Sequence, residues 1–117
     1  MRKVVVTGGA GFIGSNLVKH LLIKKYFVIN VDKLSYSANP YNIKNFNRNK
    51  NYVFYKVDLN NRKKITQILK KYQPEGIFNL AAETHVDRSI DDPKNFINSN
   101  ILGTYNLLES ILEYKKK

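Results

Sequence analysis

The sequence VVVTGGAGFIG, residues 4–14, joins a short β-branched run to a cluster of glycines. Three consecutive valines fit a strand that is buried on both faces. The glycines allow a tight turn directly after that strand, and an apolar helical pattern begins at Phe12. The stretch therefore predicts a strand, a turn and a helix in immediate succession.

The glycines follow the spacing Gly9-x-Gly11-x-x-Gly14. In this pattern the first glycine adopts the unusual dihedral angles of the turn, the second lets the backbone approach a pyrophosphate, and the third lets the helix pack close to the strand. The phosphates then lie at the helix N-terminus, where N–H groups and the helix dipole favour anions. An ordinary glycine-rich turn is the alternative, but the flanking strand and helix favour dinucleotide binding.

The composition is typical of one globular domain. Of the 117 residues, 43% are hydrophobic and 25% are charged, and no apolar run approaches the roughly 18 residues that span a membrane. The N-terminus lacks the pattern of a signal peptide. Cysteine is absent, which excludes disulfides, thiolate metal sites and cysteine catalysis. We expect a cytoplasmic protein with no membrane partner.

The formal net charge of +11 would suit a nucleic-acid partner. The lysines, however, are scattered over separate elements in pairs such as Lys24-Lys25 and Lys63-Lys64. Asparagine, isoleucine and tyrosine are enriched with them, a joint bias expected of an A+T-rich genome. We therefore predict no nucleic-acid partner.

Apolar periodicity predicts four strands alternating with helices. The predicted strands are Val4–Thr7, Phe27–Val31, Asn51–Val57 and Gly76–Leu80. The first predicted helix runs from Phe12 to about Lys25, and its apolar face consists of Ile13, Leu17, Val18, Leu21 and Leu22. One or two helical turns are predicted within Tyr41–Phe46, and a further helix has its apolar stripe at Ile65, Ile68, Leu69 and Tyr72 and ends at Pro74. The last predicted helix begins at Asp92-Pro93. This alternation predicts an α/β fold, a Rossmann-type doubly wound parallel sheet of order 3-2-1-4. A fifth strand would be expected beside the fourth, so we expect a truncated fold.

Asp32 ends the second predicted strand, 18 residues after Gly14. The dinucleotide motif places an acidic residue near this distance, where it accepts hydrogen bonds from the ribose hydroxyls. A carboxylate there repels the extra phosphate of NADP, which favours NAD, although the neighbouring Lys33 weakens that argument. The alternative is a solvated turn residue.

Four segments, taken together, resemble the extended short-chain dehydrogenase/reductases: Thr7–Gly14, Asp32–Tyr36, Val57–Leu59 and Leu80–Ile90. Within that family the chain looks most like the dTDP-glucose 4,6-dehydratases, and the block from Ala81 to Ile90 is the most specific part of the likeness. The resemblance covers the whole chain, but only about the first third of such an enzyme.

The resemblance implies NAD as the cofactor. Phe12 and Ile13 would lie over its pyrophosphate, residues 32–35 would hold the adenosine ribose, and residues 58–59 the adenine. Residues 80–84 would line the nicotinamide side, and Thr84 would also face the substrate. The implied cofactor set is Gly8, Gly11, Phe12, Ile13, Gly14, Asp32, Lys33, Leu34, Ser35, Asp58, Leu59, Leu80, Ala81, Ala82, Glu83, Thr84 and Ser99. The sequence departs from the usual family residues at Val57, Thr84 and Ser99, and the last two keep the hydroxyl.

For activity the resemblance implies a nucleotide-sugar substrate, dTDP-glucose. In the reaction that the resemblance implies, NAD would take a hydride from C4 of the glucosyl unit, water would leave across C5 and C6, and the hydride would return to C6. The family's Tyr-x-x-x-Lys pair, threonine, Asp-Glu acid/base pair and substrate domain follow the last helix, and we expect them to be absent from residues 1–117. The expected protein is thus a partial NAD-binding domain without catalytic residues, inactive alone, from an enzyme that forms a homodimer.

Several other patterns are weaker candidates for a site. Tyr52-x-x-x-Lys56 matches the catalytic pair by letters, but in a strand the two residues lie about 13 Å apart, whereas the chemistry needs one helical turn. His85 is better explained as a structural loop residue than as a base, and His20 as a solvated one. The carboxylates Glu83, Asp87, Asp91 and Asp92 resemble a metal cluster, yet the family uses this segment for cofactor and substrate, so we predict no metal.

Three alternative functions remain open from the sequence. A nucleotide-sugar epimerase or decarboxylase would share every cofactor residue with a dehydratase. A non-catalytic NAD-binding module would explain the missing catalytic residues, although the bare edge of the fourth strand argues against it. Nucleic-acid binding would show a steep dependence of affinity on salt.

Overall fold

The computed structural model describes residues 1–34, 40–81, 94 and 101–115, with the backbone alone for residues 40–42. The chain forms two compact units. The first unit comprises Met1–Lys56 and Pro74–Ala81, and the second comprises Val57–Gln73 and Ala82–Lys117.

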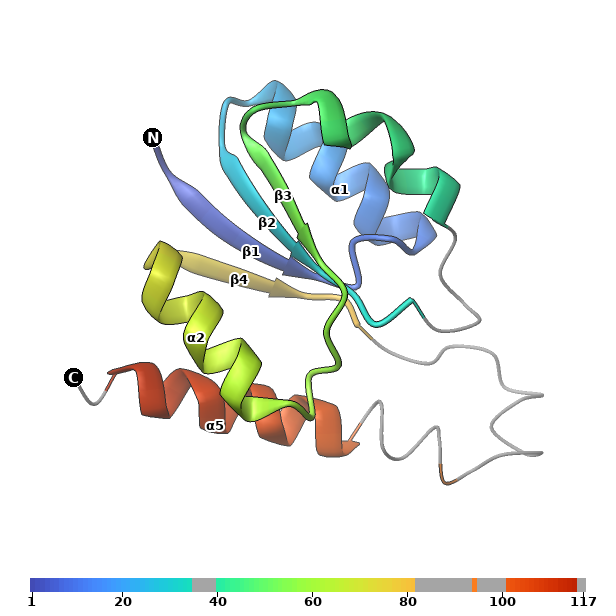
Figure 1. The fold of residues 1–117 in the computed structure, drawn as a ribbon. Helices are drawn as coiled ribbons and strands as arrows, with labels where there is room; N and C mark the ends of the chain where they lie inside the picture. The colour runs from blue at the N-terminus through green and yellow to red at the C-terminus, as the bar shows by residue number, and fades with distance from the viewer. Residues whose placement is uncertain (35–39, 82–93, 95–100, 116–117) are drawn as a thin grey trace. The chain divides into compact units, whose positions relative to one another are not determined.

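The first unit is built on a parallel sheet (Figure 1). Its strands are β1 (Lys3–Thr7), β2 (Phe27–Val31), β3 (Tyr52–Tyr55) and β4 (Gly76–Asn79). Their order is β3-β2-β1-β4, and every neighbouring pair is parallel. The predicted order 3-2-1-4 is therefore confirmed. Strand β3 is shorter than predicted because it pairs only with the last four residues of β2.

Helix α1 (Phe12–Ile23) and the 3-10 helix η1 (Pro40–Arg48) pack with the sheet to form the core of this unit (Figure 1). The core cluster consists of Val4, Val6, Val18, Leu21, Leu22, Val28 and Tyr52. Lys25 adopts a left-handed conformation with φ 71°, so α1 ends before it rather than at it. The helical turns expected around Tyr41 are those of η1.

The predicted apolar face of α1 is wrong at one residue. Ile13 is 71% exposed, because the buried stripe of α1 begins at Gly14 and Ser15 and continues through Val18. Small residues occupy the start of this stripe, where the helix approaches the turn that precedes it. A large apolar side chain at position 13 is left facing outward.

The second unit pairs two helices, α2 (Arg62–Tyr72) and α5 (Gly103–Lys115). The α2 stripe of Ile65, Ile68 and Leu69 is buried as predicted. At the N-terminus of α2, the Asn61 side chain accepts a hydrogen bond from the Lys64 N–H. Residues 101–102 form a π-helical turn before α5, and the predicted helix start at residues 92–93 lies outside the described residues.

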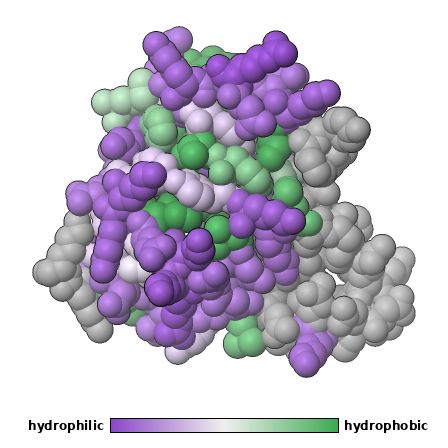
Figure 2. All heavy atoms as spheres, in the orientation of Figure 1, coloured by the Kyte–Doolittle hydropathy of each residue, from purple (hydrophilic) through white to green (hydrophobic). Residues whose placement is uncertain are grey.

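Polar side chains cover much of the face that Figure 2 shows. The paired lysines at positions 24–25 and 63–64 are all exposed, as expected for solvated helix faces. No helix within the described ranges is long and apolar enough to cross a membrane.

Candidate functional site

The glycine turn meets the end of β4. Gly8 has φ +74°, and a Cβ there would lie 2.6 Å from the carbonyl carbon and oxygen of Leu80. Gly8, rather than Gly9, therefore adopts the unusual dihedral angles of the turn, and the prediction for Gly9 was wrong. Gly9 is required for a different reason, since a Cβ there would lie 2.1 Å from Oδ1 of Asn30.

The other two glycines bring the helix to the turn. A Cβ on Gly14 would lie 2.1 Å from the Gly8 carbonyl oxygen, so α1 can start at this place only with a glycine in its first turn. Gly11 is the N-cap of α1, and its N–H donates to the same carbonyl at 3.1 Å. A glycine N-cap has no side chain to cover the N–H groups that an anion would use.

Thr7 connects the carboxyl ends of β1 and β4 and was not predicted. The side chain is fully buried, and its hydroxyl donates to Oδ1 of Asn79. Oγ1 of Thr7 also accepts from the N–H groups of Leu80 at 3.1 Å and Ala81 at 3.3 Å. A polar residue that ends a valine strand is the signal that could have identified it.

Asp32 lies under the turn rather than in solvent. It is 7% exposed, its Oδ2 accepts from the Ala10 N–H at 2.9 Å, and its Oδ1 accepts from the Leu34 N–H at 2.8 Å. The alternative of a solvated turn residue is wrong. Each carboxylate oxygen offers about two acceptor sites, so both oxygens keep capacity for further donors.

A second polar pair lies nearby and was also not predicted for the site. Nδ2 of the fully buried Asn30 donates to the Tyr52 hydroxyl at 2.9 Å. Burial raises the pKa of Tyr52 above its ordinary value; the hydrogen bond from Asn30 opposes this rise, and the charge of Asp32 adds to it. Tyr52 lies in a strand, as predicted, and not on a helix beside Lys56.

The remaining predicted cofactor residues are distributed over the chain. Phe12 and Ile13 are 79% and 71% exposed beside the turn, and Lys33 and Leu34 are partly buried. The second unit contains Asp58, exposed and accepting from the Asn60 N–H at 3.0 Å, and the buried Leu59. Ser35, Ala82, Glu83, Thr84 and Ser99, with His85 and the acidic cluster, lie outside the described residues.

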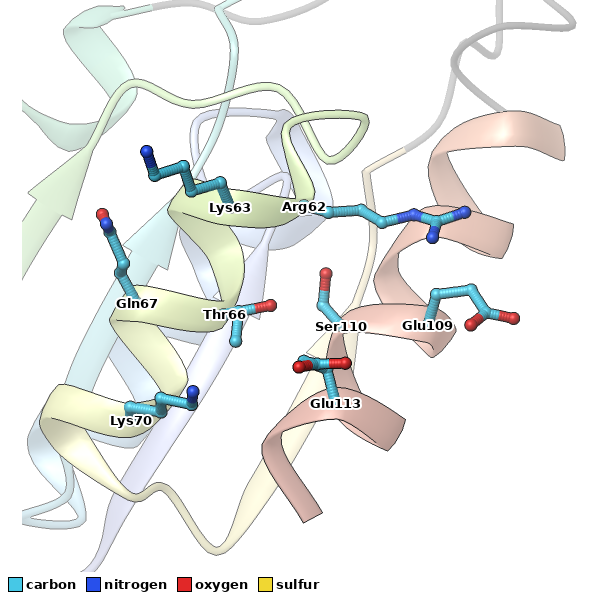
Figure 3. Close-up of a pocket in the computed structure, with 8 residues that line it drawn as sticks. All are labelled: Arg62, Lys63, Thr66, Gln67, Lys70, Glu109, Ser110 and Glu113. Atoms are coloured by element: carbon cyan, nitrogen blue, oxygen red, sulfur yellow. The ribbon is translucent and has the colours of Figure 1, made fainter. Parts of the chain in front are cut away.

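A hollow of about 360 Å³ lies between α2 and α5 (Figure 3). It is lined by Arg62, Lys63, Thr66, Gln67, Lys70, Glu109, Ser110 and Glu113. Helix α2 contributes the cations and α5 the carboxylates, an arrangement typical of a solvated groove between two helices. None of the predicted cofactor residues lines it.

Comparison with known proteins agrees with these features. The family model described as GDP-mannose 4,6 dehydratase matches residues 5–117. A dTDP-glucose 4,6-dehydratase from Haemophilus influenzae is 47% identical over 115 residues, which is 97% of this chain and 34% of that protein. The chain thus spans about a third of the length of the curated relatives it matches.

Solved structures give the same result. A dTDP-glucose 4,6-dehydratase from Streptomyces venezuelae, solved with NAD bound, matches with a TM-score of 0.89 and 34% identity over 97% of this chain and 36% of that one. A UDP-glucose 4-epimerase from Thermotoga maritima, solved with UDP-glucose, matches with a TM-score of 0.84 and 38% identity over 96% of this chain and 34% of that one. The chain therefore belongs to the GDP-mannose 4,6 dehydratase family, within the extended short-chain dehydrogenase/reductases.

Proposed function

We propose that this chain binds NAD and forms the cofactor-binding part of a dTDP-glucose 4,6-dehydratase. The observation that carries the proposal is the buried Asp32 carboxylate, which holds the Ala10 N–H at the carboxyl end of β2. The strand order reverses between β1 and β4, and open α/β sheets bind ligands at the carboxyl ends of strands around such a point.

The residues of the turn fit a dinucleotide. Gly8 and Gly9 have no room for a Cβ, so the turn carries no side chain at these two positions and a ligand can approach its backbone closely. The N-terminus of α1, which Gly11 caps, supplies N–H groups suited to phosphate. The exposed Phe12 and Ile13 supply an apolar cover beside those groups.

When bound, NAD would supply the redox chemistry of hydride removal and return, while the protein supplies binding and orientation. Asp32 would bind the ribose, Asp58 and Leu59 the adenine, and residues 80–84 with Ser99 the nicotinamide side. The relatives extend beyond the matched third, and we assign substrate binding and acid–base chemistry to those further segments. The substrate class is supported by the relatives, which are dTDP-glucose 4,6-dehydratases.

Calorimetric titration with NAD and NADP tests the proposal. At an effective dielectric constant of about 20, two charges about 4 Å apart repel by roughly 4 kcal/mol, so the chain should bind NAD at least about tenfold more tightly than NADP. Asp32→Asn removes the charge but keeps an acceptor for the Ala10 N–H. Asp32→Asn should therefore reduce the preference for NAD over NADP and largely retain the affinity for NAD.

Asp32→Ala removes the acceptor as well and should weaken both cofactors. Glu109→Gln, a carboxylate substitution outside the predicted cofactor residues, is the matched control and should leave both affinities unchanged. Absence of saturable NAD binding by the unaltered chain would contradict the proposal.

A nucleotide-sugar epimerase is the second candidate. The observation that favours it is the match to the Thermotoga maritima UDP-glucose 4-epimerase at a TM-score of 0.84. A relative of that kind would use the same cofactor residues. Because we assign substrate binding to segments beyond the matched third, competition binding of dTDP-glucose against UDP-glucose by the complete enzyme, in the presence of NAD, separates the two candidates.

We also propose a homodimer for the complete enzyme. Five large apolar side chains at and before α5 are 44–61% exposed: Ile101, Leu102, Tyr105, Leu108 and Leu112. The opposite side of α5, with Gly103, Leu107 and Ser110, is buried. Among the described residues, one side of the helix is therefore buried while the other exposes large apolar side chains, and this exposed side suits a second copy.

A further inference from the structure

Asn30 is an unusual residue for its position. Strand β2 reads Phe27-Val28-Ile29-Asn30-Val31, and every residue of it after Phe27 is buried. The Oδ1 atom of Asn30 is buried and has no hydrogen-bond partner among the described residues. Burying an unpaired amide oxygen is unfavourable, so an apolar residue would stabilise the strand better unless the amide has a role.

The amide of Asn30 lies against Gly9. A Cβ on Gly9 would be 2.1 Å from Oδ1, 2.4 Å from Cγ and 2.7 Å from Nδ2. The whole amide group thus occupies the space that a side chain at position 9 would take. It forms a support beneath the turn, against which the backbone of Gly9 rests.

Tyr52 holds that support in place. Its hydroxyl accepts from Nδ2 of Asn30 at 2.9 Å, and its ring packs on Phe46 with the ring centroids 5.5 Å apart. Both Tyr52 and Asn30 are buried, so the hydrogen bond fixes one rotamer of the amide. A residue of β3 thereby holds the β2 side chain that lies against the turn.

Strand β2 and the residue that directly follows it contribute two supports to one turn. Asn30 of β2 lies against Gly9, and Asp32, two residues later, accepts a hydrogen bond from the N–H of Ala10. We propose that Asn30, anchored by Tyr52, is a positioning residue that fixes the glycine turn and so directs its N–H groups. The consequence for the cofactor rests on the proposed function, whereas the effect on the turn does not.

The test compares three variants of the 117-residue chain. Asn30→Ala removes the support, and Tyr52→Phe removes only the anchoring hydroxyl. Val28→Ala is the matched control, because Val28 is a fully buried residue of the same strand and on the same side as Asn30. Each variant is measured for amide hydrogen exchange at Ala10 and Gly11, for NAD affinity, and for stability to urea.

Asn30→Ala should lower the protection of the Ala10 and Gly11 amides and weaken NAD binding, each by about tenfold relative to a Val28→Ala variant of similar stability. Tyr52→Phe should act in the same direction with a smaller effect. If Asn30→Ala does not fold, the Tyr52→Phe exchange data decide alone. Changes at the two amides that match those in Val28→Ala, or no change in Tyr52→Phe, would overturn the inference.

The two readouts separate the proposals. If the unaltered chain binds no NAD, the proposed function fails, and the exchange of the two amides in the ligand-free chain still decides the role of Asn30. If NAD binds and the variants change neither readout more than the control does, the proposed function stands and the inference fails.

Discussion

Gly8 and Gly76 lie near opposite ends of the β1–β4 pair and differ in their need for glycine. Gly8 has φ +74° and backbone atoms 2.6 Å from the Cβ position, whereas nothing lies within 4 Å of that position at Gly76. We expect Gly8→Ala to lower the free energy of unfolding by about 3 kcal/mol, because it combines left-handed strain with a backbone overlap. Gly76→Ala should change it by less than about 1 kcal/mol. Urea unfolding measures both, and equal effects would contradict this account.

Tyr52 should make stability depend on alkaline pH. Its pKa is raised in the folded state, chiefly by burial, so the unfolded chain releases this proton first. The contribution is fully present below the ordinary tyrosine pKa of about 10 and is lost as pH rises through the folded value. Unfolding free energies measured on both sides of about pH 10 should therefore fall less steeply in Tyr52→Phe than in the unaltered chain.

The matched control for this effect is Tyr105→Phe, which removes the hydroxyl of a ring that is 51% exposed. It should reproduce the pH dependence of the unaltered chain. The same loss of dependence in both variants would show that Tyr52 is not its source.

Residue roles were predictable where spacing alone defines them. The distance from Gly14 to Asp32 identified the acidic residue, and its burial beneath the turn is consistent with that choice. The roles of Gly8 and Gly9 were not predictable, because they depend on Leu80 and Asn30, which reach the turn only when the strands pair. Thr7 was missed for the same reason, since its partners lie more than 70 residues away.

At the scale of elements, α5 carries a testable surface. Leu108 and Leu112 are 56% and 55% exposed and lie one helical turn apart. We expect the double substitution Leu108→Gln and Leu112→Gln to weaken self-association without melting the helix, because glutamine is also a good helix former. Sedimentation equilibrium of the complete enzyme measures the association. Glu113→Gln on the same helix is the control, and a complete enzyme that is monomeric before substitution would contradict the homodimer proposal.

The elements themselves were predicted well where one pattern dominates. Buried parallel strands appear as continuous β-branched runs, and β2 has the predicted bounds. The predicted buried face of α1 was wrong at its start. Periodicity places the apolar Ile13 on that face and contains no information that Gly14 must lie against the turn. The edge strand β3 was overestimated, because its length depends on pairing with β2 rather than on its own sequence.

For the whole molecule, the property to measure is catalytic activity of the 117-residue chain by itself. We expect the purified 117-residue chain, supplied with NAD and dTDP-glucose, to form no 4-keto product, because the resemblance assigns the acid–base groups to segments beyond the matched third. Product formation is followed by chromatography, with a full-length relative as the positive control. Turnover by the chain alone would contradict this expectation. NAD binding without turnover would also fit a non-catalytic module, and adding segments equivalent to the unmatched part of the relatives would separate these two cases.

The contact of Gly8 with Leu80 and Ala81 has a consequence for how the protein is made. The turn is encoded in the first dozen residues, yet the backbone of Leu80 that lies against it is synthesised about 70 residues later. At roughly 5–20 residues per second, this interval is on the order of 4–14 s. Thus the turn leaves the ribosome before the backbone that lies against it. A cofactor in the cell would meet the complete carboxyl end of the sheet only after β4 has joined it.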